Sequence, residues 1–314
     1  KEMIRQRLGK DLLFFDGGMG TLLQEKGLAP GELPETWNLT HSEEIYKIHR
    51  QYIEAGSDII LTNTFGANAL KFHDDSCSLE EIIKAAVSHV KKAEREALLQ
   101  TGDERKIYTA LDVGPTGKLL KPMGDLEFET AYEAFKEVVI LGEQAGADLI
   151  HIETMSDTYE LKAAVLAAKE NTSLPVFATV IFDERKKLLT GADVSSVVAL
   201  LEGLGVDALG INCAMGPKEM LPVLEELIKY SSVPIIVKPN AGLPVLVDGE
   251  TVFNMEPDDF AREMEILLEQ GVSIVGGCCG TTPEHIKRLA EQVKEKTPPV
   301  ITEKKVCALT TERR

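Results

Sequence analysis

Residues 145–168 read AGADLIHIETMSDTYELKAAVLAA, and they contain one complete unit of a pattern that recurs along the chain. One helix ends at Gly146, and an apolar run typical of a buried strand covers 148–152. Asp157 then stands where its side chain can cap the next helix. Because its apolar residues, Leu149, Ile150 and Ile152, fall on both faces of an extended chain, the run indicates a parallel strand that is buried on both faces. The stretch therefore predicts a strand followed by a helix.

The same unit occurs eight times in the 314 residues. Segments with apolar residues at helical spacing follow the apolar runs at 12–15, 58–61, 107–111, 148–152, 176–181, 208–211, 235–237 and 272–275. Eight such units with right-handed crossovers close into a TIM barrel, and we predict this α/β (β/α)8 fold for residues 1–297. An open doubly wound sheet is the alternative, but the turn at 16–20 lacks the glycine spacing of a dinucleotide-binding loop. Residues 298–314 read as a linker.

The composition argues against several classes of function. Lys and Arg number 34 against 51 Asp and Glu, which gives a net charge of −17. We therefore expect no nucleic-acid partner and no anionic membrane surface. No apolar stretch approaches the ~18 residues of a membrane helix, and the start of the chain does not resemble a signal peptide, so we expect a cytoplasmic protein. Five cysteines, an odd number, favour metal binding or catalysis over a disulfide framework.

Three of these cysteines follow predicted strands, where a barrel enzyme places its active site. Cys213 follows the sixth strand, and Cys278 and Cys279 follow the eighth. Three thiolates hold Zn²⁺ firmly and leave a fourth position open, and the flanking glycines allow two adjacent side chains to reach one ion. Such a site favours activation of a substrate thiol over formation of hydroxide. A redox-active vicinal disulfide and simple burial are the alternatives.

Acidic residues and glycines at other strand ends suit an amino-acid substrate. Asp16 and Glu153 are candidate partners for an ammonium group, and the backbone N–H groups of Gly17 and Gly18 are candidates for binding a carboxylate. The alternative interpretations are that Asp16 caps the following turn and that Glu153 belongs to a structural ion pair. His151, inside the fourth strand, is predicted to be a buried core residue rather than a ligand.

The remaining features of the sequence indicate less specific roles. Two long irregular loops, 114–126 and 239–254, are predicted on the face that carries the strand ends. Trp37 lies in a polar loop that either covers the pocket or packs against the barrel. Cys77 and Cys307 are expected to have no catalytic role, and the acidic run at 256–265 to form a solvated helix face.

The strand-end residues together resemble the homocysteine S-methyltransferase family, over roughly residues 11–293. The motifs that carry the resemblance are Asp-Gly-Gly-Met-Gly-Thr (16–21), Asn-Thr-Phe (63–65), Gly-Pro-Thr-Gly (114–117), Glu-Thr (153–154), Asn-Cys (212–213), Pro-Asn (239–240) and Gly-Gly-Cys-Cys-Gly (276–280). The last of these, combined with the upstream Asn-Cys pair, is the most specific.

The resemblance implies a barrel that binds zinc through Cys213, Cys278 and Cys279. It implies that the sulfur of homocysteine takes the open zinc position and accepts a methyl group, which gives methionine. It further implies that Asp16 and Glu153 hold the substrate amino group, and that Asn240 is a temporary fourth ligand before substrate arrives. The substrate site expected from it comprises Asp16, Gly17, Gly18, Asn63, Glu153 and Asn212.

The methyl donor divides the family. Members that use betaine or S-methylmethionine consist of one barrel, whereas in the cobalamin-dependent branch folate-binding and cobalamin-binding modules follow it. Residues 306–314 resemble the linker toward the folate module, so we favour methylcobalamin carried on another module of the same polypeptide. The chain has no Asp-x-His-x-x-Gly cobalamin motif of its own. The first alternative is a methyltransferase that uses a small sulfonium or betaine donor. The second alternative is a scaffold that binds zinc and thiols without turnover.

Overall fold

Eight parallel strands form a barrel in the computed structural model, which describes residues 3–72, 77–102, 105–247 and 250–305. A parallel bridge between Phe15 and Ile59 joins the first and last strands of the sheet and closes the ring. The predicted TIM barrel is therefore confirmed, and each predicted apolar run overlaps one strand. The order around the barrel is β1 (Leu13–Phe14), β10 (Ile274–Val275), β7 (Ile235–Lys238), β6 (Ala208–Asn212), β5 (Val176–Val180), β4 (Leu149–Met155), β3 (Tyr108–Val113) and β2 (Ile59–Leu61).

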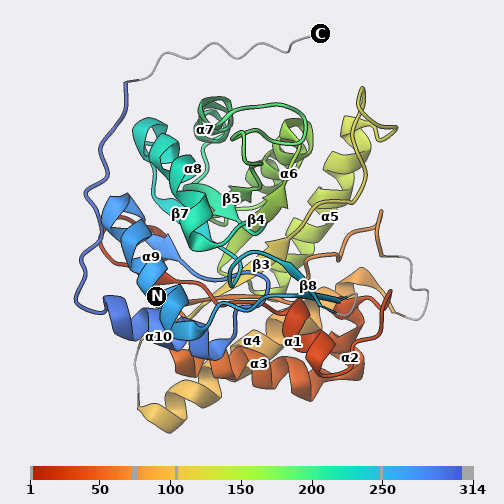
Figure 1. Cartoon of the computed structure of the whole chain (residues 1–314). Helices are drawn as coiled ribbons and strands as arrows, with labels where there is room; N and C mark the ends of the chain where they lie inside the picture. Colours follow the sequence, from red (N-terminus) through yellow and green to blue (C-terminus); the bar gives the residue numbers. More distant parts are fainter. Residues whose placement is uncertain (1–2, 73–76, 103–104, 248–249, 306–314) are drawn as a thin grey trace.

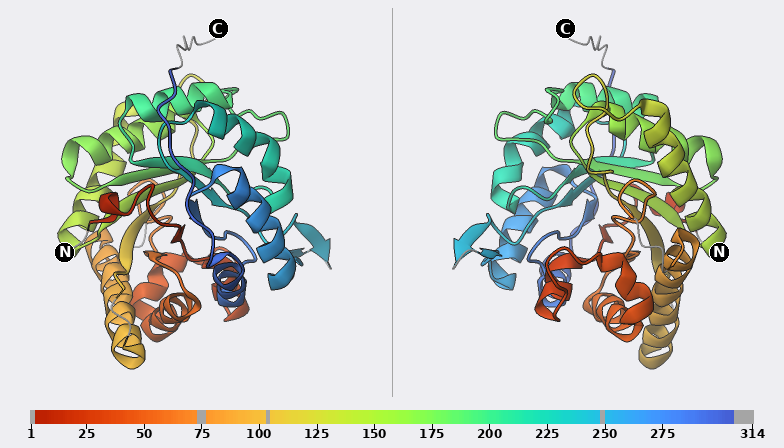
Figure 2. Two further views of the ribbon diagram at one scale, coloured as in Figure 1. Left: turned by 90° about the vertical axis from the view of Figure 1, so that its left-hand side faces the viewer. Right: turned by 90° about the vertical axis from the view of Figure 1, so that its right-hand side faces the viewer.

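Helices surround the barrel, as Figures 1 and 2 show. Those that follow the strands carry an apolar stripe, which packs on the outward-facing residues of the strands. The helical elements are η1 (Ile4–Gln6), α1 (Gly20–Glu25), η2 (Pro34–Thr36), α2 (Trp37–Thr40), α3 (Ser42–Ala55), α4 (Leu79–Thr101), α5 (Phe128–Ala145), α6 (Thr158–Asn171), α7 (Val194–Gly203), α8 (Pro217–Tyr230), α9 (Pro257–Gly271) and α10 (Pro283–Val293). Among the described residues, none of these helices combines the length and apolar composition needed to span a bilayer.

One predicted loop contains regular structure. Within 239–254, β8 (Val245–Val247) and β9 (Glu250–Val252) pair as an antiparallel hairpin that projects from the side of the barrel in Figure 2. The expectation of an irregular segment is wrong here, because β-branched residues at 245, 247, 251 and 252 favour strands even where they are exposed.

The barrel interior changes from apolar to charged along its axis. Side chains alternate along a strand, so Asp112 shares the inward face of β3 with Tyr108 and Ala110. By the same alternation Lys238 shares the inward face of β7 with Ile236. The apolar interior residues are Ile4, Leu13, Phe15, Ile59, Leu61, Tyr108, Ala110, Leu149, Phe177, Ala208, Ile236 and Ile274. Polar groups therefore gather toward the carboxyl ends of the strands.

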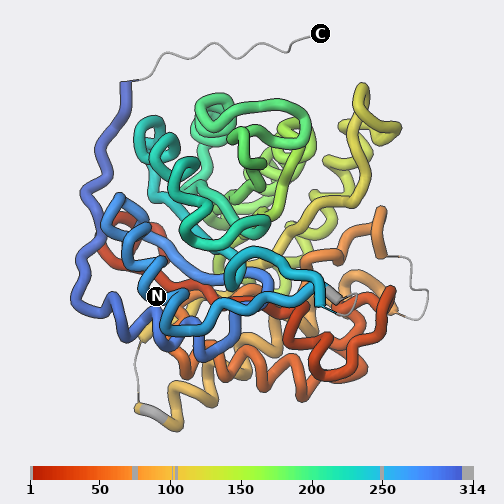
Figure 3. Tube along the Cα trace, viewed as in Figure 1, coloured from red at the N-terminus to blue at the C-terminus, as the bar shows by residue number. Residues whose placement is uncertain are grey.

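The segment after α10 follows the outside of the barrel, as the tube in Figure 3 shows. The backbone N–H of Lys304 donates a 2.7 Å hydrogen bond to Ser232 Oγ, which holds this segment against the turn after α8. Of the predicted linker, residues 306–314 lie outside the described residues, and so does Cys307. The linker role of 298–314 remains a prediction.

Close packing between neighbouring strands yields a first test. A Cβ atom on Gly210 in β6 would lie 1.8 Å from the carbonyl oxygen of Ile236 in β7. We expect Gly210→Ala to lower the free energy of unfolding by about 3 kcal/mol, because a backbone atom must move. Urea denaturation would measure this effect.

Gly203, the last residue of α7, provides the matched control because nothing lies within 4 Å of a Cβ placed there. Gly203→Ala should leave stability unchanged or raise it by up to about 1 kcal/mol. Equal urea midpoints for Gly210→Ala and the unmodified protein would show that the strands are not packed this closely.

Candidate metal and substrate site

The three strand-end cysteines lie together at the mouth of the barrel. The Sγ atoms of Cys213, Cys278 and Cys279 are all within 4.8 Å of one another, and the Cys213–Cys279 distance is 3.9 Å. All three are free thiols and are partly buried. The grouping expected from the strand order is thus confirmed, whereas the vicinal disulfide is not what the structure contains.

The end of β7 holds both cysteine segments in place. The backbone N–H of Cys213 donates to the carbonyl oxygen of Lys238 at 2.9 Å, and that of Cys278 donates to Pro239 at 2.8 Å. Cys213 has a φ of 58°, a left-handed conformation that is uncommon outside glycine. The backbone itself therefore turns the Cys213 side chain toward the other two thiols.

Asn240 adds a contact from the same segment. Its side-chain Oδ1 accepts a 3.1 Å hydrogen bond from the backbone N–H of Cys279, and Ala241 N–H donates to the Cys279 carbonyl at 3.0 Å. Asn240 therefore lies beside the thiols, although its role as a temporary metal ligand stays a prediction.

Glycines next to the cysteines are required by close approach. A Cβ on Gly277 would lie 2.1 Å from Thr281 Oγ1. Gly280 has a φ of +77°, and a Cβ there would lie 2.3 Å from Phe253 Cβ. These positions explain why a glycine-rich sequence surrounds the adjacent pair of cysteines.

Crowding gives the three thiols different proton affinities. Hydrogen bonds from the neighbouring thiols lower the pKa of Cys213 to about 3, while the contact with Cys213 raises the pKa of Cys279 to about 12. The pKa of Cys278 is also raised. Negative charge is therefore favoured on Cys213, and a bound cation would favour the thiolate form of the other two cysteines.

The sulfur spacing fits a zinc ion. Tetrahedral coordination with Zn–S bonds of ~2.3 Å places sulfur atoms about 3.8 Å apart. The 3.9 Å between Cys213 and Cys279 matches that value. Soft thiolate donors also select Zn²⁺ over hard cations such as Mg²⁺. Both the chemistry and the geometry of the donor set suit the metal.

A buried ion pair lies beneath the thiols. The Lys238 ammonium is 2.7 Å from Glu153 Oε2 and 3.3 Å from His151 Nε2. Burial alone would raise the pKa of Glu153, but the positive charge of Lys238 lowers it well below its usual value. Glu153 therefore forms a buried ion pair with Lys238, and its role toward a substrate ammonium stays a prediction. His151 is fully buried and packs on Phe15 with ring centroids 4.7 Å apart, as expected for a core histidine.

Asp16 and Asp112 complete this charged layer. Asp16 Oδ2 accepts a 3.0 Å hydrogen bond from the backbone N–H of Leu61, so its carboxyl contacts β2 rather than capping the following turn. Burial raises the pKa of Asp16 to about 8. Burial and the nearby Glu153 carboxylate raise the pKa of Asp112 well above its usual range. The Oδ1 atoms of both residues are buried and have no hydrogen-bond partner.

The two glycines predicted to bind a carboxylate also make close contacts within the protein. Gly18 N–H donates to Thr281 Oγ1 at 3.0 Å, and its carbonyl accepts a 2.7 Å bond from Tyr52 Oη. A Cβ on Gly17 would lie 2.6 Å from Thr281 Oγ1. The Gly18 amide is therefore already engaged within the chain.

Asn63 and Asn212 also have partners. Asn63 Nδ2 donates to the Pro34 carbonyl at 2.8 Å, which ties the end of β2 to η2. Asn212 Oδ1 accepts from Thr154 N–H at 2.9 Å, and its Nδ2 donates to Glu153 Oε2 at 3.3 Å and contacts Cys278 Sγ at 3.9 Å. Asn212 thus links the ion pair to the thiols, whereas the side-chain amide of Asn63 points to the η2 segment.

Lys238 is the site residue that the sequence analysis missed. Its side chain is 1% exposed in the barrel interior. The available signal was a lysine that directly continues the apolar run at 235–237, where its inward direction follows from alternation with Ile236.

Other features lie outside this centre. Trp37 is buried, stacks on His41 with centroids 4.0 Å apart and donates to Glu32 Oε1 at 2.8 Å, so it packs against the barrel. Cys77 packs against the core. The acidic run at 256–265 falls in α9, whose Phe260 and Met264 are buried while acidic residues occupy the outer face.

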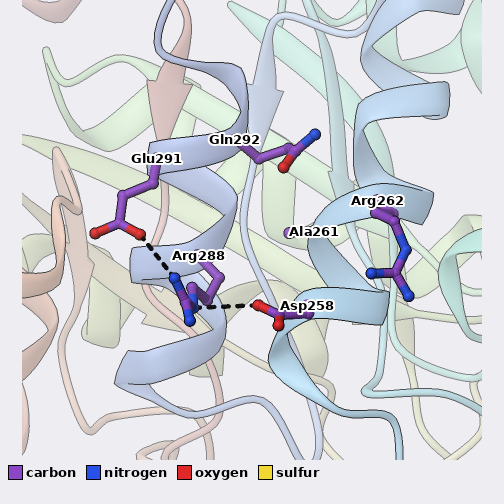
Figure 4. Close-up of a pocket in the computed structure, with 6 residues that line it drawn as sticks. All are labelled: Asp258, Ala261, Arg262, Arg288, Glu291 and Gln292. Atoms are coloured by element: carbon purple, nitrogen blue, oxygen red, sulfur yellow. Dashed lines mark hydrogen bonds and ion pairs between the residues drawn. The ribbon is translucent and has the colours of Figure 1, made fainter.

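A hollow on the surface lies between α9 and α10, as Figure 4 shows. Within it Arg288 pairs with Asp258 at 3.1 Å and with Glu291 at 3.3 Å. These side chains are solvent-exposed, and such pairs contribute little free energy. The hollow belongs to the helical layer rather than to the strand ends.

Comparison with known proteins agrees with the sequence resemblance. A family model described as homocysteine S-methyltransferase matches residues 13–293. The methionine synthase of Mycobacterium tuberculosis is 36% identical over 298 residues, and that of Mycobacterium leprae is 35% identical over 300. These alignments cover 91% and 92% of this chain but 25% of each relative, so the chain spans about a quarter of their length.

The fold has a counterpart among solved structures. The metallated form of the homocysteine methyltransferase MmuM from Escherichia coli superposes with a TM-score of 0.78 at 24% identity. The match covers 90% of this chain and 96% of that one, and at this identity it shows the shared fold. With a family model that spans residues 13–293, the chain belongs to the homocysteine S-methyltransferase family.

Proposed function

We propose that the chain is a zinc-dependent homocysteine S-methyltransferase that produces methionine, and that it forms the N-terminal barrel of a cobalamin-dependent methionine synthase. The observation that carries this proposal is the set of three Sγ atoms within 4.8 Å at the barrel mouth. The relatives named methionine synthase support the assignment to that branch.

The thiols supply the metal site in this proposal. Zinc bound to three thiolates keeps one position open and makes a thiol that enters it easier to deprotonate. Cys213, Cys278 and Cys279 hold the ion, and the hydrogen bonds to β7 keep their backbone fixed. Asn240 is the proposed fourth ligand without substrate, because an amide oxygen is a weak zinc ligand that a thiol displaces.

The charged layer orients the amino acid. Asp16 and Glu153 are proposed to hold the substrate ammonium, and the buried Asp16 Oδ1 has no partner in the protein. Gly17 is proposed to lie against the substrate carboxylate. Gly18, Asn63 and Asn212 support the walls of the site, since their polar groups already have partners.

Methylcobalamin is the proposed donor, carried on a separate module. The support is that the chain aligns with only 25% of each methionine synthase relative, which leaves room for folate- and cobalamin-binding modules. The second candidate uses S-methylmethionine or betaine, and it is favoured by the match to 96% of a homocysteine methyltransferase chain.

Replacement of one thiol tests the metal site. We expect Cys278→Ser to lower zinc affinity by more than about 100-fold and methyl transfer to a similar extent, because one of three thiolates is lost. Zinc content would be measured by mass spectrometry after dialysis. Cys77→Ser, outside the site, should keep full zinc content. Stoichiometric zinc in Cys278→Ser would contradict the assignment of ligands.

A donor screen tests the assignment to the cobalamin-dependent branch. Methionine formation from homocysteine should be fastest with free methylcobalamin and slower with S-methylmethionine or betaine. Chelation of zinc should abolish it in every case, since the metal activates the acceptor thiol. Faster turnover with a sulfonium donor than with methylcobalamin would instead select the second candidate.

The raised pKa of Asp16 predicts a pH dependence of substrate binding. With a pKa of about 8, Asp16 is protonated at pH 6.5 and becomes an ammonium partner as the pH rises. Homocysteine affinity should therefore rise between pH 6.5 and 8. The rise should be steeper than in Asp16→Asn, by up to about tenfold per pH unit. Calorimetric titrations of both proteins measure the difference. Parallel pH profiles would exclude Asp16 from ammonium binding.

A further inference from the structure

Lys238 is enclosed by the barrel and is 1% exposed. Its Nζ contacts Glu153 Oε2 at 2.7 Å and lies 4.7 Å from the centroid of the Phe15 ring. A buried ammonium is stable only where anionic partners replace its hydration. The carboxylates supply that replacement, and they also hold the Lys238 pKa above its usual value despite burial.

Lys238 fixes one end of the Glu153 carboxylate. The ammonium of Lys238 and the Nδ2 of Asn212, at 3.3 Å, both donate to Oε2, and His151 Nε2 lies 3.6 Å from the same atom. These groups come from β7, β6 and β4. Contacts from three strands on one oxygen leave the carboxylate little freedom to rotate.

Acidic side chains outnumber the Lys238 ammonium in this layer. Three carboxyl groups, those of Asp16, Asp112 and Glu153, act on the one ammonium, and His151 is neutral near pH 7 because burial lowers its pKa to about 4. The thiols of Cys213 and Cys279 are close enough to Glu153 for its negative charge to oppose their ionisation. The buried Oδ1 atoms of Asp16 and Asp112 have no hydrogen-bond donor. The layer therefore has acceptors for a second cation.

We propose that Lys238 is a positioning residue for recognition of the substrate ammonium. It holds the Glu153 carboxylate in one orientation, so that this carboxylate and the unpartnered Oδ1 of Asp16 accept hydrogen bonds from the ammonium of an amino-acid thiol. This inference rests on the proposed function and adds the residue that sets the geometry and charge of its ammonium site.

The test compares two ligands that differ in the ammonium group alone. L-Homocysteine and 4-mercaptobutyrate share the thiol and the carboxylate, and calorimetry under reducing conditions gives the dissociation constant of each for the zinc-loaded chain. Lys238→Met should weaken homocysteine binding about tenfold or more and leave 4-mercaptobutyrate within about twofold, because Glu153, the acceptor for the substrate ammonium, loses the charged donor that holds it in place. Zinc content should not change.

The controls separate this role from a general packing defect. Lys106→Met removes a partly buried lysine that pairs with Glu94 at 3.2 Å and Asp148 at 3.4 Å, and should leave both affinities unchanged. An equal loss for both ligands in Lys238→Met, or no loss for either, overturns the inference alone. Failure of the unmodified, zinc-loaded chain to bind homocysteine overturns the proposed function as well.

A double variant covers the case in which Lys238→Met does not fold. Lys238→Met combined with Asp112→Asn removes one potential charge of each sign, so fewer uncompensated carboxyl groups remain buried. We expect a preference for homocysteine over 4-mercaptobutyrate that is smaller than in the unmodified chain, because Glu153 has lost its donor. An unchanged preference would show that Lys238 does not position Glu153.

Discussion

The hydrogen bonds at the end of β7 are the interaction on which the candidate site depends. Cys213 and Cys278 belong to segments 65 residues apart, yet each donates its backbone N–H to the chain that continues β7, at Lys238 and Pro239. Barrel closure places β6 and β10 on the two sides of β7. One short stretch of backbone therefore fixes the distance between the thiols, and the same stretch carries Lys238 inward.

The site has two layers with different electrostatic demands. The thiols at the mouth gain stability from a cation that neutralises several thiolates at once. Below them, Lys238 pairs with Glu153, while Asn212 contacts Glu153 at 3.3 Å and Cys278 at 3.9 Å. This arrangement keeps the Lys238 ammonium in the acidic layer and leaves the thiols available to the proposed metal, so the two positive charges would not compete for the same ligands.

Features that depend on strand order could be predicted from the sequence. Contacts that depend on the direction of individual side chains could not. Apolar runs and the cysteines at strand ends were sufficient for the barrel and for the grouping of the thiols, because parallel strands end on one face. The pairing of Lys238 with Glu153 was not predicted, since it requires knowing that both side chains point inward at the same height. The engagement of Gly18 N–H by Thr281 also depends on a contact across 263 residues, which no local pattern reveals.

The unpartnered carboxyl oxygens support the proposal that this layer binds a ligand. A buried polar atom without a hydrogen bond destabilises the fold by about 1–3 kcal/mol. Asp16 Oδ1 and Asp112 Oδ1 both fall in this class. The apolar residues of the barrel interior, Leu13 and Ile274 among them, offset that penalty when they are buried. In the proposed site, a cation between the carboxyl groups would recover the lost interactions, so free energy that does not stabilise the fold would contribute to ligand binding.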